Sequence, residues 1–260
     1  MNATDTQTIH RVTHEIKRRK LEVLRVVDLT PRMRRITVGG AQLAGFISLG
    51  SDDHVKLFFP QTAEELATLE NLELSAGMKS KTMPPMRDYT PRRYDLDTLE
   101  LDIDFVLHGD GPAATWAAQA RPGQWLYIGG PRGSMVVPDM FDSYLLIGDE
   151  TALPAIARRL EELPANRRAL VVVEVENAAE EQTLNSAASV DVIWVHRDGS
   201  NNLLEIVQGL SIPQGKLYAW VATETALSRK VRRVLLDTHG LNEEFVKAAG
   251  YWRLDSRTED

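Results

Sequence analysis

The sequence predicts a β domain followed by an α/β domain, and two observations support this prediction. From Leu21 to about Pro138, short strand-like segments are separated by Gly/Pro turns, a rhythm typical of an antiparallel barrel or sandwich. After about residue 142, apolar strands alternate with amphipathic helices, which indicates a parallel sheet covered on both faces. We therefore expect an N-terminal antiparallel β-barrel domain at residues 1–140 and a C-terminal parallel-sheet α/β domain at residues 141–260.

One strand of the first domain alternates cleanly. Along residues 99–107, Leu101, Ile103 and Phe105 share one face and acidic side chains occupy the other. The strands of this domain are expected at residues 21–29, 33–38, 54–59, 99–107 and 125–130, with a helix at 63–73. Residues 10–20 carry two histidines and five basic residues. They are interpreted either as a solvated lead-in or as a patch for an anionic lipid or ligand.

The second domain is expected to alternate strands with helices. The strands are expected at residues 144–148, 169–175, 190–195 and 217–222, and the helices at 152–163 and 227–238. The first helix places Leu153, Ile156 and Leu160 on one apolar stripe. Gly240 ends the second helix.

Composition excludes several classes of protein. Of the 260 residues, 43% are hydrophobic and 26% are charged, as in ordinary globular domains. The absence of cysteine rules out disulfides, thiol nucleophiles and cysteine-bound zinc or iron–sulfur clusters. The net charge of −7 argues against a nucleic-acid-binding protein. No apolar run could span a bilayer, no secretory signal is visible, and the six histidines show no metal-binding spacing. We expect a cytoplasmic monomer.

The segment R-D-Y-T-P-R-R-Y-D at residues 87–95 carries the strongest local signal. Tyr89 offers an aromatic face with a hydroxyl, Thr90 a hydroxyl and backbone groups, and Arg87 a bidentate donor for phosphate. Together they suit a ligand that has both an aromatic ring system and a phosphate. The alternative is a proline-bracketed turn with an exposed arginine cluster.

Two glycine-rich segments suit phosphate. In H-G-D-G-P-A-A-T-W-A-A at residues 108–118, Gly109 and Gly111 allow close backbone approach, and Pro112 fits the first turn of a helix whose free amides attract phosphate. A Rossmann interpretation is discounted, since this helix is short and no acidic residue follows at the required distance. The loop G-G-P-R-G-S at residues 129–134 either holds phosphate or turns a barrel corner.

A further candidate site follows the first strand of the second domain. Gly148, Asp149, Glu150 and Thr151 come where that strand ends, and open α/β sheets bind ligands at the carboxyl ends of their strands. Thr151 is expected to cap the next helix beside a ligand phosphate. Asp149 and Glu150 could equally stabilise the helix start through its dipole.

The order of these motifs resembles the plan of ferredoxin–NADP reductase-like flavoenzymes. More closely, the chain resembles the siderophore-interacting proteins, a family of flavin-dependent ferric-siderophore reductases, from about Arg18 to Arg253. The motifs that carry this resemblance are D-H-V-K-L-F-F-P (53–60), R-D-Y-T-P-R-R-Y-D (87–95), D-I-D-F-V-L-H-G-D-G-P-A (102–113), P-R-G-S (131–134), G-D-E-T-A-L-P-A-I (148–156) and G-Y-W-R (250–253).

The resemblance implies FAD in the first domain and NADPH or NADH in the second, with the C-terminal tail returning to the flavin. The residues implied to contact FAD are Arg87, Tyr89, Thr90, Asp104, Val106, His108, Gly111, Ala113 and Ala114. Those implied to contact the pyridine nucleotide are Asp149, Glu150, Thr151, Glu224, Arg229 and Arg232. The two arginines, three residues apart, favour NADPH through its 2′-phosphate, although a ferredoxin donor stays open. The family commonly has Gly where Thr223 precedes Glu224 here.

The resemblance also implies the reaction, reduction of Fe(III)–siderophore complexes to release Fe(II). Such chelates are anionic, so a chain of net charge −7 needs a locally basic pocket. Lys56, Arg132 and Arg253 lie in three of the motifs and are the residues we expect to form it. The alternatives are a general NAD(P)H-dependent flavin or ferric-chelate reductase and a non-catalytic siderophore carrier on the same fold.

Overall fold

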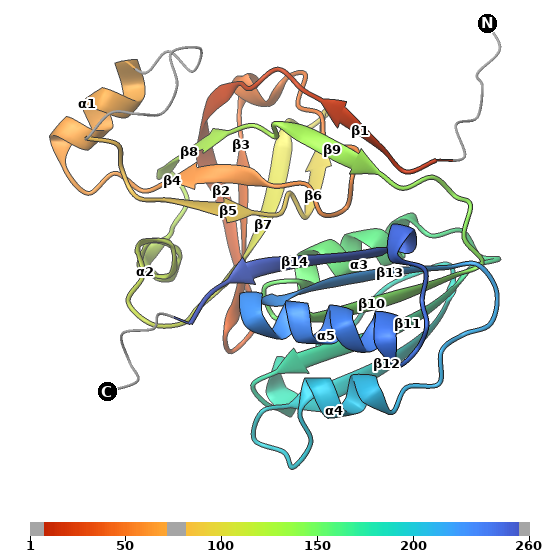
Figure 1. The fold of residues 1–260 in the computed structure, drawn as a ribbon. Coiled ribbons are helices and arrows are strands. Elements are labelled where there is room, and N and C mark those ends of the chain that lie inside the picture. Colours follow the sequence, from red (N-terminus) through yellow and green to blue (C-terminus); the bar gives the residue numbers. More distant parts are fainter. Residues whose placement is uncertain (1–7, 72–81, 255–260) are drawn as a thin grey trace, which may run out of the picture. The chain divides into compact units, whose positions relative to one another are not determined.

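The computed structural model describes residues 8–71 and 82–254 of the chain (Figure 1). The chain divides into two compact units, Met1–Pro138 and Asp139–Asp260, which are described one after the other.

The first unit contains a seven-stranded antiparallel sheet with the strand order β5-β4-β8-β2-β3-β7-β6. Its strands are β2 (Arg18–Thr30), β3 (Met33–Gly39), β4 (Val55–Phe58), β5 (Met86–Tyr89), β6 (Arg93–Asp95), β7 (Glu100–Val106) and β8 (Trp125–Gly129). Only residues 90–92 separate the edge strands β5 and β6, so the sheet curls round like a barrel. Within the described residues, no hydrogen-bond ladder joins these two edges.

Shorter elements complete the first unit. Strand β1 (His10–Thr13) pairs antiparallel with β9 (Gly133–Val136), which makes a two-stranded ribbon. The helices are α1 (Ala63–Asn71), α2 (Pro112–Gln119) and a 3₁₀ turn at Ala41–Leu43. The segment at residues 10–20, interpreted above as a solvated lead-in or as a patch for an anionic lipid or ligand, is therefore largely strand. Its pairing partner lies more than a hundred residues away, which local sequence patterns do not reveal.

The core of the barrel confirms the alternation expected at β7. Leu101, Ile103 and Phe105 are fully buried and pack in one cluster with apolar residues of the neighbouring strands. The opposite face of β7 is not solvated, because Asp102 and Asp104 are each only 6% exposed. Both carboxylates accept hydrogen bonds from side chains of the adjacent strand β3, so they help to hold β7 against β3.

The second unit is a five-stranded parallel sheet with the strand order β12-β11-β10-β13-β14. Its strands are β10 (Ser143–Asp149), β11 (Arg168–Val175), β12 (Ser189–His196), β13 (Leu217–Glu224) and β14 (Val246–Trp252). Helices α4 (Leu203–Gln208) and α5 (Thr225–Asp237) lie on one face and α3 (Leu153–Glu162) on the other (Figure 1). Short 3₁₀ turns occur at Ala178–Glu180 and Glu243–Phe245. The expected fold class, antiparallel β followed by parallel α/β, is confirmed.

Gly148 sets how closely helix α3 approaches the sheet. A Cβ atom built on Gly148 would lie 2.4 Å from the Cβ of Ala152 and 3.2 Å from the carbonyl oxygen of Ala222. No larger side chain fits there, so the chain can turn tightly from β10 into the helix. Helix α3 begins at Leu153, and its N-cap is Ala152 without a side-chain hydrogen bond. The expected capping by Thr151 is therefore wrong, because that hydroxyl bonds elsewhere.

No helix in the described part of the chain has both the length and the apolar character needed to cross a bilayer.

Candidate functional site

Helix α2 of the first unit begins at an open loop. Its N-cap is Gly111, no side chain caps it, and Pro112 occupies its first turn. A Cβ atom built at Gly109 or Gly111 would meet nothing within 4 Å, so this backbone faces open space. The amides of Ala113 and Ala114 belong to the first turn, where no intrahelical acceptor exists. This loop therefore offers backbone donors and room for an anionic group.

Strand β5 places Arg87 and Tyr89 at one edge of the barrel sheet, and Thr90 follows directly after it. The Arg87 side chain is exposed and donates to the carbonyl of Met86. The Tyr89 ring lies 4.4 Å from the ring of Phe105, centroid to centroid. Burial raises the pKa of Tyr89 well above its ordinary value, so the phenol stays a hydrogen-bond donor. A cation, a phenol and a buried hydroxyl thus follow one another along this edge.

The side chains expected along the flavin differ in exposure and in the partners they already have within the protein. The Asp104 carboxylate accepts two hydrogen bonds from Arg35, at 2.7 and 2.8 Å, and lies 4.0 Å from Arg92. Its side chain is therefore committed to the protein. Val106 ends strand β7 as a half-buried residue, and His108 is exposed in the loop that leads to helix α2.

Lys56 and Arg132 lie on neighbouring segments of the first unit. Lys56 stands opposite Gly129 in the ladder between β4 and β8, three residues before Arg132. The Lys56 ammonium pairs with Asp88 on β5 at 2.7 Å. Arg132 is exposed, and its carbonyl accepts a hydrogen bond from the amide of His14 at 2.9 Å. The structure thus holds Arg132 through its backbone and Lys56 through an ion pair.

A buried polar network holds the segment beside Arg132. The Ser134 hydroxyl donates to Asp53 Oδ2 at 2.5 Å, and the same oxygen accepts from the Ser48 hydroxyl and the Gly50 amide. Because the Ser134 proton points at the carboxylate, His14 Nε2, 2.7 Å from Oγ, must be the donor of that contact. Asp53 and Ser134 are 3% and 2% exposed, so this network fixes the start of β9 from inside.

In the second unit, Asp149 ends the central strand as a buried carboxylate with three donors. Oδ1 accepts from the amide and hydroxyl of Thr151, at 2.9 and 2.5 Å, and Oδ2 accepts from Trp252 Nε1 at 2.7 Å. Burial raises the pKa of Asp149 above its ordinary value, although the hydrogen bonds act in the opposite direction.

Glu150 is held by a cation that the sequence did not reveal. Arg197, just after β12, donates to both oxygens of Glu150 at 2.5 and 2.6 Å, and it also contacts Glu174 at 3.2 Å. Burial lowers the pKa of Arg197, but its hydrogen bonds and charge interactions with Glu150 and Glu174 outweigh this and raise it. Through Glu150 and Glu174, Arg197 links the carboxyl ends of the neighbouring strands β10, β11 and β12.

The remaining expected nucleotide contacts lie on helix α5. Glu224 is the N-cap of this helix, and its carboxylate accepts from the amides of Ala226 and Leu227 at 2.6 and 3.0 Å. Arg232 pairs with Glu243 at 2.5 Å. Arg229 is exposed one turn before Arg232 and lines a cavity together with Arg253. The structure therefore brings Arg229 together with Arg253, and not with Arg232.

Sequence reasoning missed several residues that shape these sites. Asp53, Ser134 and Trp252 stood within motifs that were singled out, but only the neighbouring basic residues received roles. The sequence offered two signals. Asp53 is an acidic residue shortly before Lys56, and Ser134 follows Arg132 in a glycine-rich loop. Arg197 had one signal, its position directly after a strand of the parallel sheet.

The fold defines a class of protein. A crystal structure of a ferredoxin NADP+ reductase from Neisseria gonorrhoeae with bound FAD and NADP matches with a TM-score of 0.64 over 91% of this chain and 99% of that one, at 11% identity. At this identity the likeness shows the fold alone. The chain therefore has the same fold as that reductase.

The chain belongs to the siderophore-interacting protein family. Residues 22–135 match the siderophore-interacting FAD-binding domain, and residues 141–255 match the siderophore-interacting protein domain. The expected family and the expected FAD-binding domain are confirmed.

Three relatives illustrate the similarity. An NADPH-dependent ferric-chelate reductase of Escherichia coli is 35% identical over 93% of this chain and 95% of its own length. The ferric vibriobactin reductase ViuB of Vibrio cholerae is 30% identical over 95% of each chain. The crystal structure of a siderophore utilization protein from T. fusca superposes with a TM-score of 0.85 at 36% identity, covering 96% of this chain and 99% of that one.

The residues of the first unit fit FAD. An anionic diphosphate needs backbone donors and space, and the loop at Gly109 and Gly111 has both. A flavin ring needs aromatic or aliphatic contact with hydrogen-bond donors nearby, and the phenol of Tyr89 at the end of β5 and the hydroxyl of Thr90 directly after it have this chemistry. Arg87 is an exposed cation on the same strand, and a guanidinium group suits phosphate.

Proposed function

We propose that this protein is an FAD-dependent NAD(P)H reductase that reduces Fe(III)–siderophore complexes and thereby releases Fe(II). The observation that carries the proposal is the open, uncapped start of helix α2, in a unit that also carries Arg87 and Tyr89 on strand β5 and matches the FAD-binding family. The names of the E. coli and V. cholerae relatives, which are reductases of ferric chelates, support the same reaction.

Each residue proposed for FAD has a distinct task in binding. The amides of Ala113 and Ala114, with the open backbone at Gly111, hold the diphosphate, and Arg87 neutralises part of its charge. Tyr89 and Thr90 orient the ring system, and the chain at Asp104, Val106 and His108 borders it. When bound, FAD accepts two electrons as hydride from the pyridine nucleotide and passes them singly to Fe(III).

The carboxyl edge of the parallel sheet is proposed to bind the pyridine nucleotide. Asp149, Thr151 and Glu224 are held rigidly there by their own hydrogen bonds, so the edge is preorganised. Glu150 lies at the same edge, where the hydrogen bonds from Arg197 hold its carboxylate in place. NADPH is the proposed donor, as the name of the E. coli relative suggests.

The proposed substrate is an anionic ferric chelate, which Lys56 and Arg132 of the first unit and Arg253 of the second attract. A chain of net charge −7 repels anions in general, so local cations are required. The protein is proposed to act as a monomer in the cytoplasm, where NADPH is regenerated.

The test is a coupled measurement on the purified, FAD-loaded protein under anaerobic conditions. NADPH oxidation should require a ferric catecholate chelate, and a ferrous-specific dye should trap about two Fe(II) per NADPH, since the nicotinamide gives two electrons. Chelate binding without NADPH oxidation or Fe(II) formation would contradict the reductase and favour a carrier.

A general ferric-chelate reductase is the second candidate. The name of the E. coli relative specifies a ferric chelate and no siderophore, which favours this broader substrate range. Rates with ferric citrate, free flavin and a ferric catecholate separate the two. A clear preference in kcat/KM for the catecholate supports the siderophore reductase, and equal values support the general enzyme.

A further inference from the structure

The loop that carries Arg132 is held by the basic segment at residues 10–20, to which the proposed function gives no role. The amide of Gly130 donates to the carbonyl of Lys17 at 3.1 Å, and the amide of His14 donates to the carbonyl of Arg132 at 2.9 Å. These two bonds tie the backbone of the loop to the basic segment on both sides of the residue that separates Gly130 from Arg132.

Arg19 adds a side-chain bond to the same contact. Its Nη1 donates to the carbonyl of Gly130 at 2.9 Å and, less closely, to the carbonyl of Lys17 at 3.3 Å. Gly130 has a φ of 96°, a conformation that favours glycine, and it is buried, so its carbonyl needs a partner from the protein. Arg19 therefore fixes the peptide group that lies two residues before Arg132.

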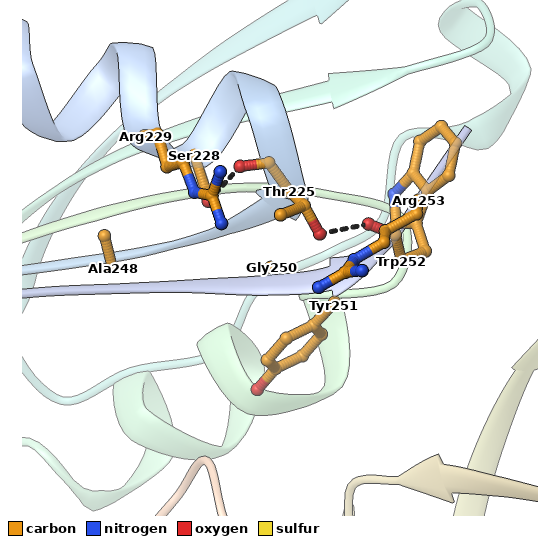
Figure 2. Close-up of a pocket in the computed structure, with 8 residues that line it drawn as sticks. All are labelled: Thr225, Ser228, Arg229, Ala248, Gly250, Tyr251, Trp252 and Arg253. Carbon is orange, nitrogen blue, oxygen red and sulfur yellow. Dashed lines mark hydrogen bonds between the residues drawn. The ribbon is translucent and has the colours of Figure 1, made fainter. Parts of the chain in front are cut away.

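Arg19 is a buried cation whose charge the chain does not neutralise. It is 4% exposed, its Cζ lies 5.2 Å from the centroid of the Phe46 ring, and its Nε has no hydrogen-bond partner. In the described part of the chain, no carboxylate lies within 4 Å of this guanidinium group, and burial alone acts on its pKa, which it lowers. By contrast, the exposed Arg229 and Arg253 of the second unit line a cavity (Figure 2).

A buried charge without an ionic partner opposes folding, so stability alone does not account for an arginine at this position. What Arg19 does provide is the fixed direction of the loop at Gly130. The side chain of Arg132 is exposed and makes no ion pair among the described residues, so the backbone that carries it sets where it lies. A guanidinium group that is already in place loses less conformational freedom when it binds an anion.

We propose that Arg19 is a positioning residue for the anionic ferric chelate, which holds Gly130 and thereby places Arg132. The inference rests on the proposed function, in which Arg132 attracts the chelate. Arg19 itself does not touch the chelate, because its side chain is buried beneath the loop.

The test measures chelate binding without electron transfer, because gallium(III) replaces iron(III). Two probes are titrated into the FAD-loaded protein by calorimetry, the trianionic gallium(III) tris-catecholate and the neutral gallium(III) tris-hydroxamate. Arg19→Met keeps the length of the side chain but removes its donors. It should weaken the tris-catecholate by about fivefold and the neutral complex by less than about twofold. Arg19→Lys still donates to the Gly130 carbonyl and should bind both probes within about twofold of the wild type.

A double-mutant cycle tests whether Arg19 acts through Arg132. In an Arg132→Gln background, Arg19→Met should change tris-catecholate binding by less than about twofold, because the residue that it positions is already gone. Arg158→Met is the matched control, at a buried arginine of helix α3 that is 7% exposed. It should lower the stability of the protein and leave the binding of both probes unchanged.

Three results would overturn the proposal. They are an Arg19→Met variant that binds the tris-catecholate as the wild type does, one that weakens both probes alike, and an effect that is as large without Arg132 as with it. Circular dichroism and Tm establish that each variant is folded, and Arg19→Gln takes the place of Arg19→Met in the same cycle if the latter does not fold. If the probes bind as expected but NADPH does not reduce the ferric catecholate, the proposed reductase is wrong and the role of Arg19 stands.

Discussion

The indole Nε1 of Trp252 donates a hydrogen bond to Oδ2 of Asp149 across 2.7 Å. The bond joins the last strand of the parallel sheet to the end of its central strand, although 103 positions separate the two residues. Asp149 is 3% exposed, and each of its oxygens depends on donors from the protein. Loss of the indole N–H leaves a buried carboxylate oxygen of Asp149 without its donor.

Trp252→Phe should therefore destabilise the protein. The substitution keeps an aromatic ring but removes the N–H donor, and we expect a loss of about 1–3 kcal/mol in the free energy of unfolding at neutral pH. Urea unfolding followed by circular dichroism measures it. Trp125→Phe, at a half-exposed tryptophan, is the control and should change stability by less than about 0.5 kcal/mol. Equal stability of the two variants would contradict the role of the bond.

The raised pKa of Asp149 predicts a pH dependence of stability. Between the ordinary value of 3.8 and the raised value, the folded state holds a proton that the unfolded state has lost. The free energy of unfolding contributed by this group therefore falls as the pH rises through that window. Asp149→Asn cannot titrate, so its stability relative to the wild type should improve as the pH rises across the window.

Urea unfolding of both proteins at intervals from about pH 4 to 8 measures this difference. The test is how the stability difference between the variant and the wild type changes with pH. Its size at any one pH is not a test, because the amide also alters the hydrogen bond to Trp252. Stability curves that run parallel over the whole range would show that Asp149 titrates alike in both states.

The ion pair between Lys56 and Asp88 predicts opposite effects of two substitutions. Both side chains are substantially exposed, so breaking the pair should scarcely affect stability. Asp88→Asn removes an anion beside Lys56 and should lower KM for an anionic ferric chelate by about twofold. Lys56→Gln should raise that KM by about threefold or more. A neutral chelate is the control substrate, and equal effects on both substrates would remove Lys56 from the chelate site.

The network around Asp53 predicts that Ser134 positions Arg132. Ser134→Ala removes a donor to Asp53 and an acceptor for His14 and for the Leu49 amide, which should cost about 1–3 kcal/mol in stability. If the network aims Arg132, KM for an anionic chelate should rise with little change in kcat. Ser200→Ala, at an exposed loop serine, is the control. A stability loss with unchanged KM would leave the network a purely structural role.

Local patterns in the sequence predicted most of the regular structure. Strand β7 was found because its alternation is complete within seven residues, and helix α3 because its apolar stripe repeats within one helix. Strands β1 and β14 were missed, since each is recognised by a distant partner and not by its own pattern. His10 pairs with Val136, and Gly250 pairs with Thr223.

The features of the candidate sites also divide into those that local sequence predicts and those that depend on distant partners. The open glycine loop before α2 could be predicted, because backbone freedom and helix starts are local properties. The partners of Glu150 and Asp149 could not, because the strand order of the sheet decides which carboxyl ends meet. The sequence also suggested a pair of arginines three positions apart, but Glu243 neutralises one of them and the cavity joins the other to Arg253.

The central claim is that the barrel unit binds FAD that exchanges electrons with the pyridine nucleotide and the ferric chelate. One anaerobic absorbance titration tests it most directly. The purified protein should show the visible bands of bound flavin, lose them on addition of NADPH, and recover them on addition of a ferric catecholate. A protein that stays colourless after reconstitution with FAD would contradict the account, as would one whose reduced flavin the chelate does not reoxidise.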